Sequence, residues 1–312
     1  MHDTLKTGKI GKKETRGIVF DIQRYSIHDG PGLRTTIFLK GCPLRCKWCS
    51  NPESQNPYPE LFIRKDKCNR CMRCVGVCHV GAITLDEDLR VDRSRCDFCM
   101  KCVDVCPTGA IKSTGEYMSV EQVIEEASKD EIFYRNSGGG ITISGGEPLY
   151  QGEFTLELLK MCKEKNFHTA LDTCGYGRWE IFAEILEYTD LVLFDVKHLD
   201  SEMDRKMTGV GNELILKNLE RIGEKGKSMW IRVPVIPGYN DSEEYIKEFA
   251  DFLSKVHFEK VSLLPYHNWA EEKYRALSMH YPLNGLLPLK EEDVYSLRDI
   301  LETYGMDVTI GY

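Results

Sequence analysis

From about residue 119 onward, short apolar runs alternate with longer stretches in which apolar residues recur every three or four positions. The short runs are rich in Val, Ile and Leu and indicate strands, whereas the longer spacing indicates amphipathic helices. The sequence therefore predicts strands at 141–144, 168–172, 191–196, 230–236, 261–264 and 307–310, and helices at 120–128 (N-capped by Ser119), 154–165, 180–187, 212–225, 242–256 and 291–304.

Two more strands are predicted near the N-terminus, at 17–23 and 34–40. A turn at 26–32, which contains Gly and Pro, separates them. Alternating strands and helices are typical of a parallel sheet with helices outside. Counted from the strand at 34–40, there are roughly six repeats, two short of a closed (β/α)8 barrel. We therefore expect the α/β fold class, as a partial (β/α)6 TIM-like barrel with a side opening.

Eleven of the thirteen cysteines fall into three tight groups. The first group, Cys42, Cys46 and Cys49, directly follows the predicted strand at 34–40. A cube of four irons and four sulfides normally takes four cysteine thiolates, so three clustered thiols predict a 4Fe-4S cluster with one iron open to an external molecule. The alternatives are a zinc site completed by a distant ligand and a redox dithiol at Cys46 and Cys49. Paired zinc knuckles have a different spacing.

The second and third groups form an internal duplication, repeated after 28 residues and followed each time by Gly-Ala-Ile. The spacing is that of bacterial two-cluster ferredoxins, in which the fourth cysteine of each run ligates the other cluster. On this pattern cluster A takes Cys68, Cys71, Cys74 and Cys106, and cluster B takes Cys96, Cys99, Cys102 and Cys78.

One position departs from the ferredoxin pattern. His79 stands where the second run has Pro107, and we expect it to reduce local rigidity rather than to remove a cluster. Histidine ligation and a zinc-stabilised knuckle pair are the alternatives. The expected domains are a ferredoxin-like α+β domain with two 4Fe-4S clusters at 58–112, inserted into a barrel formed by 1–57 and 113–312.

Three motifs together resemble the radical S-adenosylmethionine (SAM) superfamily: Asp29-Gly30-Pro31-Gly32, the Cys42/Cys46/Cys49 triplet and Gly145-Gly146-Glu147-Pro148. Within that superfamily the chain is similar to the activating enzymes of glycyl radical enzymes, from about Gly17 to the C-terminus. The resemblance implies that SAM chelates the open iron and is reductively cleaved to a 5′-deoxyadenosyl radical. It further implies that this radical takes hydrogen from one backbone glycine of a partner enzyme.

The resemblance also implies the SAM contacts, which stand mostly at the predicted carboxyl ends of strands, where parallel barrels collect their chemistry. Gly145 and Gly146 permit close backbone approach, and Glu147 offers a carboxylate to the SAM amino group. Each polar residue could instead be a hydrogen-bonded strand end, and the glycine motif a turn without a ligand. The implied SAM-binding residues are Asn51, Gly145, Gly146, Glu147, Asp172, Asp195, Lys197 and His267.

Four further residues have open roles. Arg232 either reaches a carboxylate or packs in the core through its aliphatic stem. Trp48 either shields the cluster or stacks on adenine. Cys162 is expected to be a small buried hydrophobe, and Cys174, after a strand end, is a possible site residue. No acid or base is assigned, because the cofactors carry the chemistry.

The net charge and the N-terminal segment limit the kinds of binding partner and the cell compartment that the sequence predicts. A net charge of −8 and a pI near 5.6 argue against a nucleic-acid-binding face. The one basic cluster, from Lys6 to Arg16, is expected to be a solvated end, and it has no apolar signal region. The sequence contains no run of 18 apolar residues, so it predicts no membrane-spanning helix. Because so many clustered thiols require a reducing compartment, we expect a cytoplasmic protein that is used under anaerobic conditions.

The expected partners are a glycyl radical enzyme as protein substrate and an electron donor such as flavodoxin or ferredoxin, with electrons relayed through the ferredoxin-like domain. One alternative function is a radical SAM enzyme that oxidises another peptide or a small molecule; the peptide-oxidising members generally carry their extra cysteines after the barrel. A second is a ferredoxin-type electron-transfer protein, for which Glu147 and an open cluster would have no purpose.

Overall fold

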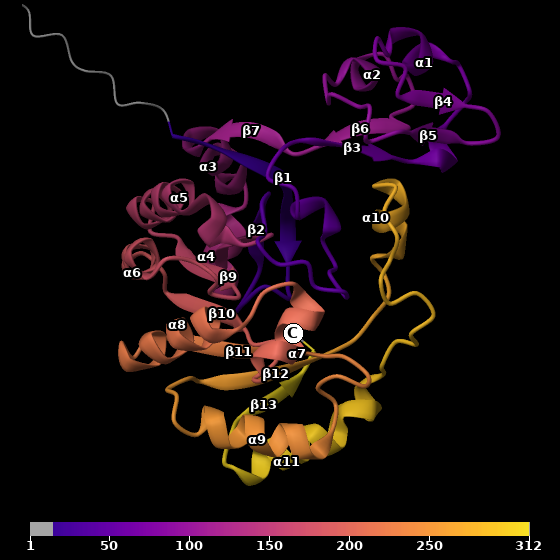
Figure 1. The fold of residues 1–312 in the computed structure, drawn as a ribbon. Helices are drawn as coiled ribbons and strands as arrows, with labels where there is room; N and C mark the ends of the chain where they lie inside the picture. The colour runs from indigo at the N-terminus through magenta and orange to yellow at the C-terminus, as the bar shows by residue number, and fades with distance from the viewer. Residues whose placement is uncertain (1–14, 312) are drawn as a thin grey trace, which may run out of the picture.

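The computed structural model describes residues 15–311, and its main body is a nine-stranded sheet accompanied by helices (Figure 1). The strand order is β13-β12-β11-β10-β9-β8-β2-β1-β7. The parallel strands are β2 (Arg34–Leu39), β8 (Gly140–Gly145), β9 (His168–Thr173), β10 (Leu191–Asp195), β11 (Met229–Val235), β12 (Lys260–Pro265) and β13 (Val308–Ile310). The predicted strands are confirmed, and the fold is α/β with a large, mostly parallel sheet.

Two strands at one edge run antiparallel to their neighbours. β1 (Arg16–Ser26) pairs antiparallel with β2 on one side and with β7 (Glu116–Ser119) on the other. The pairing includes Arg16, so the chain is not frayed at this residue, although its side chain is exposed as expected for a solvated end. The rest of that basic segment, from Lys6 to Lys13, lies outside the described residues.

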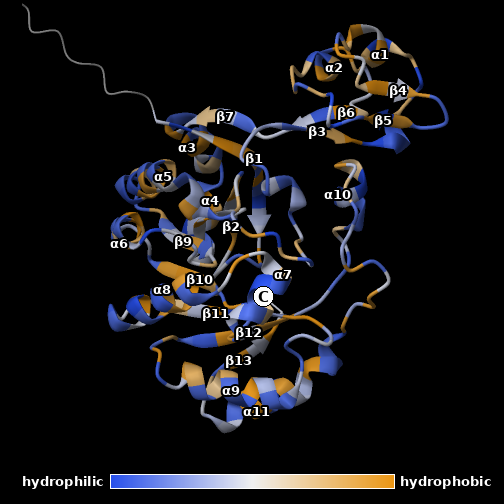
Figure 2. Cartoon of the chain, in the orientation of Figure 1, coloured by the Kyte–Doolittle hydropathy of each residue, from blue (hydrophilic) through white to orange (hydrophobic). Residues whose placement is uncertain are grey.

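The helices that the apolar spacing predicts are present as α3 (Val120–Ser128), α5 (Gly152–Glu164), α6 (Trp179–Glu187), α8 (Glu213–Glu224), α9 (Glu243–Leu253) and α11 (Tyr295–Thr303). Ser119 caps α3 as predicted, because its hydroxyl accepts a hydrogen bond from the Gln122 N–H while the Gln122 side chain accepts one from the Ser119 N–H. Figure 2 shows hydrophilic and hydrophobic residues alternating along α9 and α11. Their apolar stripes face the core, where Phe182, Phe194 and Phe249 are fully buried.

Outside residues 58–112, three α-helices of the described chain were not predicted: α4 (Glu131–Ser137), α7 (Ser201–Thr208) and α10 (Glu271–Ala276). None exceeds eight residues, which is too short for a repeating apolar spacing to be recognised. Two of them, α7 and α10, contact the cysteine loop described below. No helix within the described residues has the length and apolar content of a membrane span.

The segment that carries the duplicated cysteines forms a separate lobe at the upper right of Figure 1. It contains two antiparallel pairs, β3 (Glu60–Ile63) with β6 (Ile111–Thr114) and β4 (Ile83–Leu85) with β5 (Leu89–Val91), and two short helices, α1 (Arg73–Val77) and α2 (Lys101–Asp104). Its buried apolar side chains form a cluster of their own, apart from the main core. Lys40, fully buried after β2, donates to Glu60 of β3 at 3.1 Å and joins this lobe to the sheet.

Candidate active site

The first cysteine group forms a loop at the carboxyl end of β2. Gly41 begins it with a φ of +91°, a conformation that glycine adopts at little cost. Two neighbouring segments hold the loop through its backbone: Gly41 N donates to Ser54 O at 2.6 Å, and Arg45 N donates to Thr208 O, at the end of α7, at 2.6 Å. The loop is therefore fixed on both sides before any ligand is considered.

The thiols of this loop lie in a desolvated environment. Burial raises the pKa of the Cys46 thiol to about 12, although the nearby Lys197 ammonium acts in the opposite direction. Burial also raises the pKa values of Cys42 and Cys49. A thiolate in such a place needs a cationic partner, and bound iron is one that deprotonates its thiol ligands. The residues thus fit the cluster that their spacing predicts.

Gly145 and Gly146, at the end of β8, lie directly against this loop. A Cβ atom on Gly146 would lie 2.3 Å from the carbonyl oxygen of Gly41 and 3.1 Å from the Cβ of Cys42. Gly146 N donates to Leu39 O at 2.8 Å, and Glu147 N donates to Gly41 O at 2.9 Å. The glycine motif and the cysteine loop therefore form one unit, and a side chain at residue 146 would separate them.

The Glu147 carboxylate is buried, with 1% of the residue exposed, and protein donors engage both oxygens. Oε1 accepts from the Leu149 N–H at 3.0 Å and from the Thr173 hydroxyl at 2.6 Å, while Oε2 accepts from the Cys174 N–H at 2.9 Å and from its thiol at 3.0 Å. Burial raises the pKa of Glu147, against these hydrogen bonds. Glu147 thus joins the ends of β8 and β9, and it brings Cys174 into the site.

Four charged residues form a network at the ends of β9, β10 and β11. The Arg232 guanidinium donates to Asp172 Oδ1 at 2.5 Å and to Asp195 Oδ1 at 2.8 Å, and Lys197 Nζ lies 3.1 Å from Asp195 Oδ2. Ser144 donates to the other Asp172 oxygen at 2.6 Å. Of the two readings for Arg232, the structure supports contact with carboxylates.

The pKa values of the two carboxyl groups in this network shift in opposite directions. Burial raises the pKa of Asp172 to about 6, despite the Arg232 charge. Burial also opposes ionisation of Asp195, but Arg232 and Lys197 outweigh it and hold the pKa of that carboxyl below its ordinary value. The result is a polar wall that presents charges of both signs, as recognition of a zwitterionic amino acid requires.

His267 and Asn51 complete the set of sequence-predicted residues. The His267 ring follows β12 and stacks on Trp269, with 4.3 Å between the ring centroids. Its Nδ1 is buried and has no hydrogen-bond partner among the described residues, and burial lowers the pKa of the ring. Asn51 Oδ1 accepts from Lys273 Nζ of α10 at 2.8 Å. A buried ring nitrogen without a partner is what a ligand contact requires.

Cys162 is fully buried in the main core, as predicted. Thr173 and Cys174 were not assigned to the SAM contacts, and neither was Lys273. Thr173 and Cys174 sit beside Asp172, so their place after a predicted strand was a usable signal. For Lys273 the sequence offered none, because its contact with Asn51 spans 222 residues.

In the second cysteine region, the four thiols assigned to cluster A line one pocket, together with Met72, Leu85 and Ile111 among others. The Cys106 sulfur accepts a hydrogen bond from the Ile111 N–H at 3.4 Å, and the Cys78 sulfur accepts one from the Ala82 N–H at 3.1 Å. Such bonds to sulfur are among the features that tune iron–sulfur clusters. The convergence of Cys68, Cys71, Cys74 and Cys106 fits the crossed ligand set.

The cluster B region repeats the backbone conformation of the cluster A region. Arg70 and Met72 have φ values of 57° and 62°, and their counterparts Phe98 and Met100 have values of 55° and 60°. This left-handed region costs a non-glycine residue roughly 1–3 kcal/mol. Left-handed residues in such turns also occur in the backbone concavities of many iron–sulfur sites. Burial, with Cys96 and Cys99 nearby, raises the pKa of Cys102 to about 11.

His79 lies on the surface of this lobe. Its Nε2 is 3.0 Å from Asp97 Oδ2, and ligand atoms of His79, Asp97 and Cys99 lie within 4.8 Å of one another. The histidine therefore stands beside a cysteine assigned to cluster B, engaged with a carboxylate.

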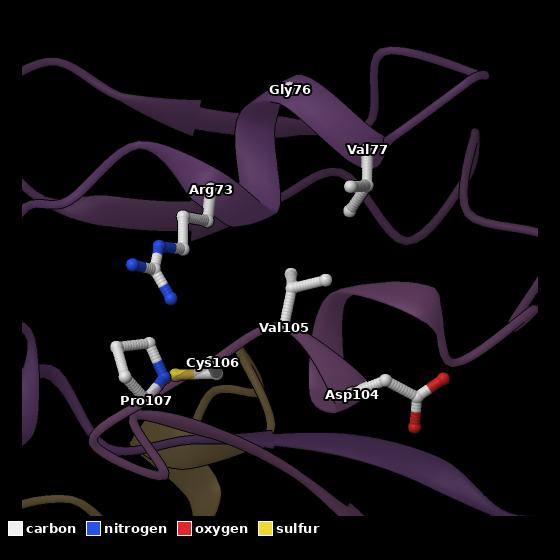
Figure 3. A pocket seen from close by; sticks show the side chains of 7 residues that line it. All are labelled: Arg73, Gly76, Val77, Asp104, Val105, Cys106 and Pro107. Atoms are coloured by element: carbon white, nitrogen blue, oxygen red, sulfur yellow. The ribbon is translucent and has the colours of Figure 1, made fainter.

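An open cleft of about 560 Å³ separates α1 from α2 (Figure 3). Gly76 and Val77 line one side, and the residues 28 positions later, Asp104 and Val105, line the other. The cleft thus lies between equivalent residues of the two repeats. Its remaining walls are Arg73, Pro107 and the cluster A cysteine Cys106.

Comparisons with known proteins agree with this geometry. A radical SAM superfamily model matches residues 93–253, a 4Fe-4S dicluster model matches 67–110, and a 4Fe-4S single cluster model matches 28–85. The isethionate sulfite-lyase activating enzyme of Oleidesulfovibrio alaskensis is 43% identical over 93% of this chain and 96% of its own. The trans-4-hydroxy-L-proline dehydratase activating enzyme of Clostridioides difficile is 41% identical over 94% of this chain and 99% of its own. QueE from Escherichia coli, 12% identical with a TM-score of 0.50 over 95% of this chain and 93% of its own, shares the fold.

The chain is therefore a member of the radical SAM superfamily, which works with a 4Fe-4S cluster and SAM. Within that superfamily it belongs to the activating enzymes of glycyl radical enzymes, as the sequence predicted. The activity of this family is reductive cleavage of SAM and generation of a glycyl radical on a partner enzyme. The matching dicluster model indicates iron–sulfur sites beyond the first.

Proposed function

We propose that Cys42, Cys46 and Cys49 bind three irons of the site cluster and that the amino acid part of SAM occupies the fourth. The supporting observation is convergence: the cysteine loop, the glycine motif, the charged network and His267 all follow the carboxyl ends of neighbouring parallel strands. When bound, the cluster and SAM supply an electron and a radical able to take hydrogen from a C–H bond.

The protein's own contribution is to bind and orient the ligand. Lys197 carries the cation suited to the SAM carboxylate, and Asp172 and Asp195 carry anions suited to its amino group and ribose hydroxyls. His267 offers a ring nitrogen, and Asn51 an amide. Gly145 and Gly146 bring backbone to the site, and Glu147, whose carboxylate accepts hydrogen bonds from Thr173 and Cys174, remains the proposed contact of the SAM amino group.

For the rest of the architecture, we propose a partial (β/α)6 barrel at 1–57 and 113–312, with a ferredoxin-like domain at 58–112. The separate core of that lobe supports the division, although the β3–β6 pair continues to Thr114. The domain would hold cluster A on Cys68, Cys71, Cys74 and Cys106, and cluster B on Cys96, Cys99, Cys102 and Cys78, which makes three 4Fe-4S clusters in all. The eleven cysteines grouped at iron-ligand spacing support a reducing, cytoplasmic setting.

Anaerobic reconstitution tests this assignment. Three clusters require about twelve irons and twelve sulfides per chain, and dithionite-reduced protein should convert SAM to 5′-deoxyadenosine and methionine. A protein that binds about eight irons and leaves SAM intact would contradict the open site cluster. It would then favour an electron-transfer protein.

The proposed protein substrate is a glycyl radical enzyme, in line with the activating roles of the relatives. Mixing the reduced protein and SAM with candidate partner enzymes should give an electron paramagnetic resonance (EPR) doublet on the correct one. If SAM is cleaved and no candidate partner gives a doublet, oxidation of another peptide becomes the better function.

The electron donor is proposed to approach the ferredoxin-like domain at the cleft between α1 and α2, where Cys106 lies in the wall. Residues 58–112 contain ten Lys and Arg against eight Asp and Glu, a charge of +2, while the rest of the chain carries −10. Two oxidised 4Fe-4S clusters with their thiolates would add about −4 to this domain, so the feature suited to an acidic donor such as flavodoxin or ferredoxin is the exposed Arg73 in the wall of the cleft and not the total charge.

Substitution Arg73→Glu tests this donor site, with Arg90→Glu, an exposed change outside the cleft, as the matched control. Arg73→Glu should slow flavodoxin-driven cleavage of SAM several-fold and leave dithionite-driven cleavage unchanged. Equal slowing by both substitutions would indicate a general charge effect instead of a docking site.

A further inference from the structure

The segment between β12 and α11 forms a strap that returns to the cysteine loop. Helix α10 lies within it, apart from the helices that accompany the sheet (Figure 1). Trp48, from the cysteine loop, packs against the apolar cluster of this strap, which includes Tyr266, Tyr274 and Tyr281. The last third of the chain thus covers the residues that follow Cys49.

One side chain of the strap makes polar contacts with that loop. Lys273 Nζ lies 2.8 Å from Asn51 Oδ1 and 2.7 Å from Glu53 Oε1. Glu53 is 7% exposed, and its other oxygen, Oε2, is buried without a hydrogen-bond partner among the described residues. Lys273 is therefore a cation in direct contact with a buried carboxylate four residues after Cys49.

The contact with Asn51 has a directional consequence. A lysine ammonium can only donate hydrogen bonds, whereas an Asn side chain has one accepting oxygen and one donating NH₂ group. Because Lys273 must face the oxygen, the NH₂ group of Asn51 is turned away from α10. The backbone N–H of Asn51 also contributes a hydrogen bond to the Cys49 thiol, so the residue is held at both ends.

We infer that Lys273 is a positioning residue: it fixes the Asn51 amide so that its NH₂ group donates to the SAM carboxylate, and it neutralises Glu53 beside the site cluster. This inference rests on the proposed function. The competing explanation is an ordinary stabilising ion pair, since 37% of the Lys273 side chain is exposed. Exposed ion pairs contribute about 0–1 kcal/mol to stability and have no directional effect on a ligand.

Three variants of the full, reconstituted chain separate these explanations. Lys273→Met removes the cation, Lys273→Arg retains it, and Arg275→Met removes the ion pairs that a neighbouring α10 residue makes with Glu271 and Glu272. SAM affinity is measured from the change that SAM causes in the EPR spectrum of the reduced cluster, and iron content and Tm are measured alongside.

Lys273→Met should weaken SAM binding by roughly 10-fold, within the range found when an outer partner of a metal ligand is removed. Iron content should not change, and the KM for SAM should rise more than kcat falls. Lys273→Arg should recover most of the affinity, and Arg275→Met should match the wild type. Unchanged SAM affinity in Lys273→Met, equal loss in Arg275→Met, or loss of iron in Lys273→Met would overturn the inference.

A double variant tests whether Lys273 acts through Asn51. Asn51→Ala alone should weaken SAM binding, and adding Lys273→Met to it should cost little more, because the two changes remove one interaction. Additive losses would contradict action through Asn51. If the wild-type EPR spectrum does not respond to SAM, the proposed function itself fails. If the wild type responds and the Lys273→Met variant responds equally, only the inference about Lys273 fails.

Discussion

The two cysteine-rich regions of the molecule hold their thiols by different means. The Cys42/Cys46/Cys49 loop is fixed by partners from distant parts of the chain, including the carbonyl of Thr208, the glycine pair at the end of β8 and Lys273 of the strap. The duplicated cysteines are held by short local turns, and Cys71 and Cys99 are exposed. A site that must bind a cofactor and a partner is built into the sheet, whereas one suited to electron transfer lies at the surface.

The largest expected difference follows from removing one thiol in each region. Cys46→Ala should abolish SAM cleavage with dithionite while about eight irons remain. Cys74→Ala should remove cluster A and retain dithionite-driven cleavage, because the site cluster does not depend on the ferredoxin-like domain for its ligands. Iron analysis and 5′-deoxyadenosine formation check both, and loss of cleavage in Cys74→Ala would show that the two regions are not independent.

A substitution in the glycine motif should have a smaller effect, confined to the Cys42/Cys46/Cys49 loop. Gly146→Ala forces a Cβ to 2.3 Å from Gly41 O, which displaces the cysteine loop; cluster content at the site and SAM cleavage should fall by roughly 10- to 100-fold. Gly76→Ala, assayed with dithionite because Gly76 lines the proposed donor cleft, is the matched control, since nothing lies within 4 Å of its Cβ position. Equal activity in the two variants would mean that the loop tolerates movement.

The charged network allows a third test of the built-in site. Arg232→Met leaves Asp172 and Asp195 buried together without their shared cation, and breaking such a pair costs about 3–5 kcal/mol. We expect a lower Tm and much weaker SAM binding, with the iron–sulfur signals of clusters A and B retained. Arg298→Met, at an exposed ion pair on α11, should leave all three measurements unchanged.

The smallest effect concerns Asp204, on α7 beneath the cysteine loop. Burial raises its pKa to about 6, and its Oδ1 lacks a partner among the described residues. The folded protein therefore binds this proton more tightly than the unfolded chain does, so stability is lost as pH rises from about 4 to about 6. Asp204→Asn should remove that loss and stabilise the protein at pH 7.5 by about 1–2 kcal/mol.

Thermal unfolding at pH 5 and pH 7.5 measures the Asp204 effect. Asp172 titrates in the same range with the same sign, so Asp204→Asn should flatten the pH dependence only in part. The exposed carboxylate of Glu220 on α8 serves as the control, through Glu220→Gln. An Asp204→Asn variant that is less stable at pH 7.5 would show that the carboxylate has a partner in solution.

The sequence predicted the parallel strands well because their apolar runs are buried on both faces, as at the adjacent residues Val192 and Leu193 of β10. The crossed ligand set of the duplicated cysteines stays a prediction; the pocket that Cys68, Cys71, Cys74 and Cys106 line together fits it. The partners of Arg232 and Lys273 could not be predicted, since both contacts depend on how distant strands and loops are brought together. The burial of Glu147 was also missed, because a strand-end motif does not show which way a side chain turns.

The left-handed residues Arg70, Met72, Phe98 and Met100 bear on how the protein fails in air. Each holds an unfavourable backbone angle in a turn proposed to bind a cluster, and Met72 and Met100 directly precede the short helices α1 and α2. If oxygen destroys the proposed clusters, only the small apolar core of the lobe offsets this conformational cost, and the lobe should unravel while the nine-stranded body stays folded. Oxidative inactivation would then begin at the periphery and be visible as proteolytic nicking between Cys68 and Cys106.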